Sequence, residues 1–309
     1  MVGIDDYPSS PLAGCVKDAS RMAQILGTHH DGAPNFDCKT LLSPGAAVTR
    51  SALRTAAAEL FDKQVQTALF YFAGHGAMTS RGGILVTQDA KANDEGVTFT
   101  ELLEMVAQSK ATEKVVVLDC CFGGAVATLP LFEDSKVIPK ESCFLAGCRD
   151  TETAQETAKG GLFTSLVVSA LEGAGADATG KVTIANVYTH VDDILSGWQQ
   201  RPMFGANVSN MIPLRNCAPA VPLDVLRLLT KYFPEPEHEF PLDPAYEPDG
   251  AAPDPDKVRI FGHLQKLRDA RMLLPLGATH LYYAAVNSQA CHLTALGRYY
   301  WHRAKSGRI

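Results

Sequence analysis

The chain has 309 residues, 46% of them hydrophobic and 20% charged, and a formal net charge of −6. This composition is ordinary for a globular protein, and the length exceeds that of one usual domain, so we expect a core domain with an appendage. No apolar run reaches the length of a membrane span, and residues 1–6 lack the basic start of a secretion signal, which predicts a cytoplasmic protein with no membrane partner.

Apolar periodicity predicts alternating strands and helices over the first two hundred residues. Helices are expected at 12–26, 50–63, 99–109, 161–171 and 184–195, and buried strands at 68–73, 115–118 and 144–148. Shorter strands are expected at 38–42, at 84–87 in a hairpin arm, and at 211–214 as an edge strand because it contains a proline. The alternation is typical of an α/β fold with a mostly parallel central sheet, and this domain should close near residue 218.

The pattern changes after residue 218. Residues 219–256 contain one expected helix, at 223–232, and then runs of Pro and acidic residues that are typical of an extended, solvated connector. Residues 257–309 predict a helix at 257–273, a hairpin through 281–285 and a last helix at 293–301, an order that resembles a small α+β winged-helix module. The predicted domains are therefore 1–218, 219–256 and 257–309.

The charge of the last module separates it from the rest of the chain. Residues 257–309 hold nine Lys and Arg against one acidic residue, Asp269. A basic module of this kind suggests nucleic-acid phosphate as one candidate partner. The alternatives are that it docks on the acidic first domain or binds an acidic regulatory protein, because a winged-helix pattern alone does not define a function.

Two of the buried strands end at residues with catalytic chemistry. Residues 68–73 run into Gly74, His75 and Gly76, and residues 115–118 run into Asp119, Cys120 and Cys121. Open α/β sheets place ligands and chemistry at the carboxyl ends of their strands. An imidazole base beside a thiol is the usual pair for nucleophilic catalysis. A single His or Cys in a sequence is more often a packing residue, so the prediction depends on the two occurring together.

The residues around both positions resemble the two signature blocks of caspase-like cysteine peptidases, closest to the metacaspase and orthocaspase branch. The blocks are Tyr-Phe-Ala-Gly-His-Gly at 71–76 and Asp-Cys-Cys-Phe-Gly-Gly at 119–124, with the His about 50 residues before the Cys. The departures are Phe122, where many members carry His, and Gly123, where many carry Ser. The resemblance implies a caspase-like three-layer sandwich whose first strand lies within residues 2–7.

The resemblance also implies roles for individual residues. Cys121 becomes the nucleophile, Cys120 its variable neighbour and His75 the general base. The main-chain N–H groups of Gly76 and Cys121 would hold the oxyanion. Such sites lack a firm third member, so none is predicted.

In metacaspases the pocket for the side chain before the scissile bond is built from positions that correspond here to Cys15, Asp18, Ala73 and Asp119. Two carboxylates facing one concave site would repel each other unless a cation enters, so protein substrates with Arg, and then Lys, before the cut are expected. The alternative is structural: Asp18 caps the first helix and Asp119 hydrogen-bonds the turn.

The segment 129–141 corresponds to the activation loop of the family. Lys136 and Lys140 are its basic residues and therefore candidates for cleavage, by the enzyme itself or by an upstream activating protease, although an ordinary solvated loop is an equal alternative. Calcium dependence is common among metacaspases but cannot be read from the small cluster at 133–134. Eight cysteines without a CxxC pair favour reduced thiols, so no zinc-type metal and no cofactor are predicted.

Two classes of function follow. The first is a cysteine endopeptidase cleaving after basic residues, activated by processing or by a partner, with a setting in bacterial defence or cell death implied by the resemblance alone. The second is a catalytically silent scaffold, or a DNA-binding regulator that acts through residues 257–309. The presence of both His75 and Cys121 favours the first.

Overall fold

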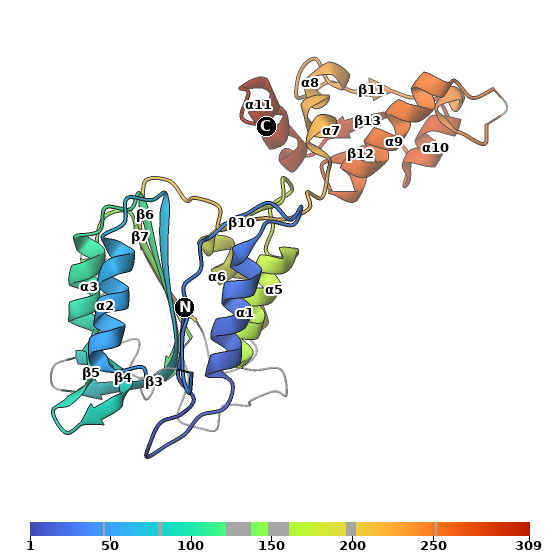
Figure 1. Ribbon diagram of the computed structural model, residues 1–309. Coiled ribbons are helices and arrows are strands. Elements are labelled where there is room, and N and C mark those ends of the chain that lie inside the picture. The colour runs from blue at the N-terminus through green and yellow to red at the C-terminus, as the bar shows by residue number, and fades with distance from the viewer. Residues whose placement is uncertain (46, 80–81, 122–136, 148–160, 196–201, 251) are drawn as a thin grey trace. The chain divides into compact units, whose positions relative to one another are not determined.

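The computed structural model describes residues 1–309 except 46, 80–81, 122–136, 148–160, 196–201 and 251. The chain divides into two compact units (Figure 1). Unit 1 comprises Met1–Ala176 and Lys181–Cys217, and unit 2 comprises Asp177–Gly180 and Ala218–Ile309. Within the described residues, no helix combines the length and the apolar character needed to cross a bilayer.

An eight-stranded sheet forms the centre of unit 1. Its strands are β1 (Val2–Gly3), β2 (Leu41–Leu42), β3 (Thr67–Thr79), β4 (Gly82–Lys91), β5 (Asp94–Thr98), β6 (Glu113–Cys121), β7 (Ser142–Ala146) and β9 (Met203–Asn207). They lie in the order β2-β1-β3-β6-β7-β9, with β4 and β5 extending from β3 as an antiparallel arm. The neighbours from β2 to β7 are parallel, and β9 runs antiparallel to β7. The predicted α/β class with a mostly parallel sheet is confirmed.

Helices cover both faces of this sheet, as Figure 1 shows. One face carries α1 (Cys15–Gly27), α5 (Leu162–Ser169) and α6 (Ile184–Leu195), and the other carries α2 (Arg50–Phe61) and α3 (Phe99–Ala107). A π-helical turn, η3 (Ala170–Ala174), follows α5, and β8 (Lys181–Val182) pairs with β10 (Arg215–Asn216).

The strand sequences explain the two layers. Successive strand residues point to opposite faces. Phe72 of β3 and Leu118 of β6 therefore join the α2–α3 core, while Tyr71 and Val117 join the α1–α5–α6 core. Because both faces are buried, these strands are apolar without interruption, which is how the sequence revealed them.

The edge strand expected at 211–214 is wrong. The strand at that edge is β9, and the Ile212 N–H donates instead to the Glu113 side chain at 3.3 Å. Pro213 next to it has no N–H to give to a ladder. The five residues of β9 include Gly205 and Asn207, which are poor strand formers, so the sequence pattern gave no sign of it.

Unit 2 contains helices and a small antiparallel sheet. Its elements are α7 (Leu223–Arg227), α8 (Leu229–Tyr232), β11 (Phe240–Pro241), η4 (Pro244–Tyr246), α9 (Pro255–Asp269), β12 (Leu273–Leu276), α10 (Leu281–Val286), β13 (Ala290–Leu293) and α11 (Ala295–Lys305). The strand order is β11-β13-β12. The hairpin expected through 281–285 is wrong: this segment is α10, because Leu281, Ala284 and Ala285 are buried at helical spacing, and β12 and β13 on either side of it form the hairpin.

The extended connector expected over 219–256 also differs from the structure. Val225, Phe233 and Tyr246 from this segment lie in one buried core with Phe261 and Trp301 from the last module. Several of the Pro and acidic residues begin helices: Asp243 and Pro244 start η4, and Asp254 and Pro255 start α9. Unit 2 therefore holds eleven Lys and Arg and eleven Asp and Glu. Its zero net charge weakens the electrostatic case for nucleic-acid binding.

Phe233 provides a test of this shared core. It is fully buried, and its carbonyl accepts a 2.6 Å hydrogen bond from the Trp301 indole. We expect Phe233→Ala to lower the free energy of unfolding of unit 2 by about 3–5 kcal/mol. Urea unfolding followed by Trp301 fluorescence, in a Trp198→Phe background, measures this. The exposed Glu237→Ala should change it little, and cooperative unfolding of an isolated 257–309 fragment would contradict the shared core.

Candidate active site

The pairing of β3 with β6 brings the two predicted catalytic positions together. The ladder runs in parallel from Thr67 opposite Glu113 to its last pair, His75 opposite Cys121. Cys121 ends β6, and His75 ends the parallel part of β3, which continues to Thr79 in the pairing with β4; both therefore lie at the edge where open α/β sheets place their chemistry. The side chain of Cys121 lies outside what the structure describes.

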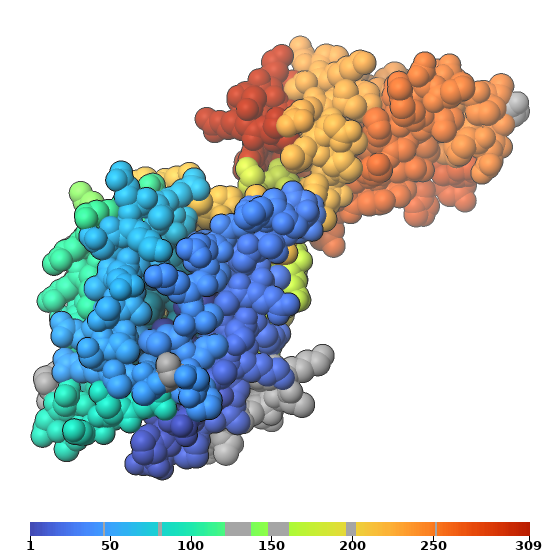
Figure 2. Space-filling view, in the orientation of Figure 1, coloured from blue at the N-terminus to red at the C-terminus, as the bar shows by residue number. Residues whose placement is uncertain are grey.

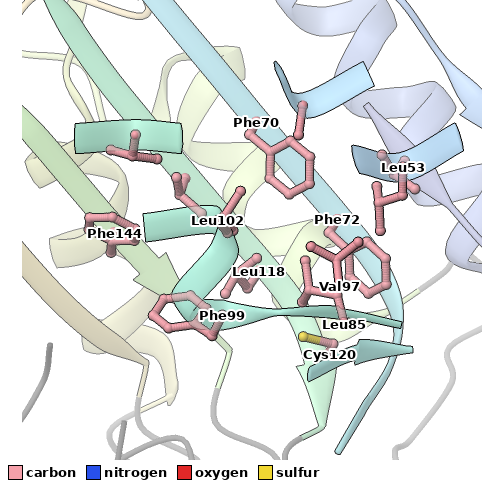
Figure 3. Close-up of a cluster of buried hydrophobic side chains, with 14 of the residues drawn as sticks. Leu53, Phe70, Phe72, Leu85, Val97, Phe99, Leu102, Leu118, Cys120 and Phe144 are labelled. Atoms are coloured by element: carbon pink, nitrogen blue, oxygen red, sulfur yellow. The ribbon is translucent and has the colours of Figure 1, made fainter. Parts of the chain in front are cut away.

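The neighbouring thiol, Cys120, belongs to the core. Figure 3 shows it among the side chains beneath α2 and α3, with Phe72, Leu85 and Leu118, and it is only 1% exposed. A thiol enclosed in apolar side chains behaves as a small hydrophobic group, not as a nucleophile. The structure thus leaves Cys121 as the candidate of the pair.

The imidazole of His75 is held by a main-chain group. Its Nε2 atom lies 2.7 Å from the Ser10 carbonyl oxygen. A carbonyl can only accept, so in this contact Nε2 carries the proton and donates it. In the neutral ring Nδ1 is then the acceptor, which is the state that a general base requires. The sequence did not reveal Ser10, because a main-chain carbonyl has no residue signature.

The predicted pocket residues lie on the α1–α5–α6 side of the sheet. Asp18, in the first turns of α1, is 2% exposed, Asp119 is 3% exposed, and Ala73 is 1% exposed and is the ladder partner of Asp119. Cys15 begins α1, where its N–H donates to the Asp5 carboxylate at 2.8 Å. The turn that carries Cys15 and Asp18 is therefore fixed by a carboxylate at the end of the first strand segment.

Both pocket carboxylates reach the beginning of α5. The Gly161 N–H, at the N-cap of α5, donates to Asp18 Oδ2 at 2.8 Å, and the Thr164 hydroxyl donates to Asp119 Oδ2 at 2.6 Å. The guanidinium of Arg21 lies 3.7 Å from Asp18 Oδ1. Two carboxylates from separate elements thus bind to the first residues of one helix, and their role as a substrate pocket stays a prediction.

Tyr71 of β3 is hydrogen-bonded to this group through Thr164. Its hydroxyl lies 2.7 Å from Thr164 Oγ1, and because Thr164 gives its proton to Asp119, Tyr71 donates to Thr164. Burial raises the pKa of Tyr71 well above its usual value, and the charges of Asp119 and Asp18 raise it further. Tyr71, Thr164 and Asp119 therefore form one buried chain of hydrogen bonds. Sequence reasoning missed Tyr71 and Thr164, which appeared only as strand and helix residues.

The remaining predicted positions are partly described. Gly76 follows His75 in β3 and pairs with Leu85 of β4. Lys140 is exposed, whereas Lys136 and most of the 129–141 segment lie outside the described residues, as does the 133–134 cluster. In the described part of the chain, no three His, Cys, Asp or Glu side chains are grouped so that they could hold a metal ion.

A thiol with an imidazole beside it is the pair used in cysteine-type nucleophilic catalysis, and the ladder sets His75 opposite Cys121. The caspase-domain family model matches residues 1–212, and the chain therefore belongs to the caspase family. This confirms the resemblance at the level of the family, and the metacaspase branch stays a prediction.

Among solved structures, the chain is similar to protein GSU0716 from Geobacter sulfurreducens. The TM-score is 0.50 at 16% sequence identity, over 68% of this chain and 92% of that protein. At this identity the likeness concerns the fold. A comparison with curated proteins found no match.

Proposed function

We propose that this protein is a cysteine endopeptidase that cleaves after basic residues, Arg before Lys, with Cys121 as nucleophile and His75 as general base. The observation that carries the proposal is the last pair of the β3–β6 ladder, His75 opposite Cys121, with the buried carboxylate of Asp119 two residues before Cys121 and that of Asp18 bound to the N–H that begins α5. Membership of the caspase family supports the class of reaction.

In the proposed reaction His75 Nδ1 takes the thiol proton of Cys121, and the thiolate attacks the peptide carbonyl carbon. The carbonyl oxygen becomes an oxyanion, for which the N–H groups of Cys121 and Gly76 are the proposed donors. The imidazolium then protonates the leaving amine as the C–N bond breaks. Water, deprotonated by His75, hydrolyses the resulting thioester and regenerates the thiol. The Ser10 carbonyl keeps the ring oriented in both half-reactions.

The specificity follows from charge. Asp18 and Asp119 are both almost wholly buried, and buried like charges repel strongly because the local dielectric constant is low. Arg21 lies 3.7 Å from one Asp18 oxygen, and a substrate guanidinium would add a second cation that can form charge-assisted, bidentate hydrogen bonds with the carboxylates. A Lys ammonium supplies the charge without the planar fork, and a substrate carboxylate would add a third negative charge.

A panel of fluorogenic peptides ending in Arg, Lys, Asp or Leu tests the function. We expect the highest kcat/KM for Arg, a lower value for Lys, and no measurable cleavage after Asp or Leu. Cleavage after Asp would contradict the charge argument. Failure of the wild type to cleave any peptide, with the 129–141 segment both intact and cut, would favour the silent scaffold.

Activation by a cut in the 129–141 segment is part of the proposal. The pocket prefers basic residues, so Lys136 and Lys140 suit the enzyme's own specificity. The exposure of Lys140 supports its accessibility to a protease.

A further inference from the structure

Tyr7 fills a gap in the hydrogen bonding of β3. The Ala73 carbonyl accepts from the Ile4 N–H at 3.0 Å, so the odd-numbered residues of β3 turn their main-chain groups towards the first segment of the chain. Beyond Ile4 that segment leaves the sheet, and the N–H of His75 loses its strand partner. The Tyr7 hydroxyl oxygen takes its place and accepts from the His75 N–H at 3.0 Å.

The position of Tyr7 is determined from several sides. Its hydroxyl donates to the Val86 carbonyl of β4 at 3.1 Å, and the side chain is 6% exposed. Figure 2 shows the dark blue start of the chain against the teal β4–β5 arm. Burial raises the pKa of Tyr7 far above its usual value, so the hydroxyl stays neutral and can donate and accept at once.

Tyr7 also contacts the imidazole itself. The two ring centroids are 4.6 Å apart, with the planes tilted by 53°. Gly74 leaves the space for the hydroxyl, since a Cβ at that position would lie 2.5 Å from Tyr7 Oη. Gly74, between Ala73 and His75, therefore has to be a glycine, because any larger side chain would clash with the Tyr7 hydroxyl.

We propose that Tyr7 is a positioning residue for the catalytic base: its hydroxyl holds the main chain of His75 and its ring holds the imidazole. The inference rests on the proposed function, in which His75 is the base. Ser10, three residues further on, holds Nε2, so one short segment orients the histidine at both ends. A small rotation of the ring would displace Nδ1 from the thiol, and displacements of about 1 Å cost about 100-fold in rate.

The first test is Tyr7→Phe, which removes the hydroxyl and keeps the ring. We expect kcat on the Arg peptide to fall about 10- to 100-fold with KM unchanged. The matched control is Tyr232→Phe in unit 2, which removes the hydroxyl of another buried tyrosine, 7% exposed as a residue, that lies 2.7 Å from His263 Nδ1. The control should lose stability without loss of kcat. A Tyr7→Phe enzyme with wild-type kcat would overturn the proposal.

Gly74→Ala gives a second test, which keeps the Tyr7 hydroxyl but forces it to move. We expect kcat to fall in the wild-type background and to fall by a smaller factor in a Tyr7→Phe background, because the closest clash is with the hydroxyl oxygen. Equal losses in the two backgrounds count against a role of the hydroxyl.

A third measurement separates this inference from the proposed function. The rate at which iodoacetamide alkylates Cys121 depends on how well His75 takes the thiol proton. If no peptide is cleaved, the proposed function fails, and the alkylation rate still decides the role of Tyr7. A slower rate in both His75→Gln and Tyr7→Phe supports positioning, and a wild-type rate in either variant overturns it.

Discussion

Replacing Cys121 with alanine is expected to abolish peptide cleavage, with a loss in kcat of about 10⁴-fold or more. Alanine has no nucleophilic side chain, and Cys121 is the residue opposite His75 in the ladder. His75→Ala should cause a loss of similar size, since the two groups act as one unit and their losses do not add. The measurement is the kcat of purified variants on the Arg peptide.

The control for this prediction is the adjacent cysteine. Cys120→Ala removes a sulfur from the α2–α3 core, so it should lower stability and keep most of the activity. If Cys120→Ala abolished cleavage and Cys121→Ala retained it, the assignment of the nucleophile would be wrong. The Cys121→Ala protein also shows, by mass spectrometry, whether a cut at Lys136 or Lys140 is made by the enzyme itself or by another protease.

Thiol labelling gives independent support. Burial, reinforced by the charges of Glu113 and Glu141, raises the pKa of the Cys143 thiol to about 12. At neutral pH this thiol stays protonated and unreactive. Cys143 is therefore an internal reference, and Cys121 should be alkylated much faster in the same sample.

The sequence predicted those parts of the site that depend on runs of residues. Residues 68–73 and 115–118 are buried on both faces, so their composition revealed them as central strands, and parallel neighbours must end at one edge. That argument placed His75 near the two adjacent thiols, the family resemblance selected Cys121, and the register sets these two residues opposite each other in the ladder.

The rest depended on contacts between residues distant in the chain. Ser10 acts through its main-chain carbonyl, a group that every residue has. Thr164 hydrogen-bonds Asp119 although the two residues are 45 positions apart in the sequence. Residues 219–256 were predicted as an extended connector because proline and acidic residues dominate their composition. Their folding depends instead on the few buried side chains between those residues, such as Phe233. Composition averages over a segment and so hides which positions form a core.

The carboxylates of the pocket carry the second large prediction. We expect Asp119→Asn and Asp18→Asn each to lower kcat/KM on the Arg peptide roughly 30- to 4,000-fold. This equals a loss of about 2–5 kcal/mol of transition-state stabilisation, because each variant removes one partner of a buried charge pair with the substrate. Asparagine keeps the size of the side chain and an oxygen that can accept from Gly161 or Thr164, so the loss should report charge and not collapse of the site.

Stability is the control that separates recognition from structure. Asp18 and Asp119 are both almost wholly buried, and Asn at either position removes a buried charge and its desolvation cost while keeping an oxygen for Gly161 or Thr164. Each Asn variant should therefore unfold at a Tm equal to or above that of the wild type. The alternative, in which Asp18 only caps α1 and Asp119 only binds Thr164, predicts the reverse: a lower Tm with cleavage after Arg retained.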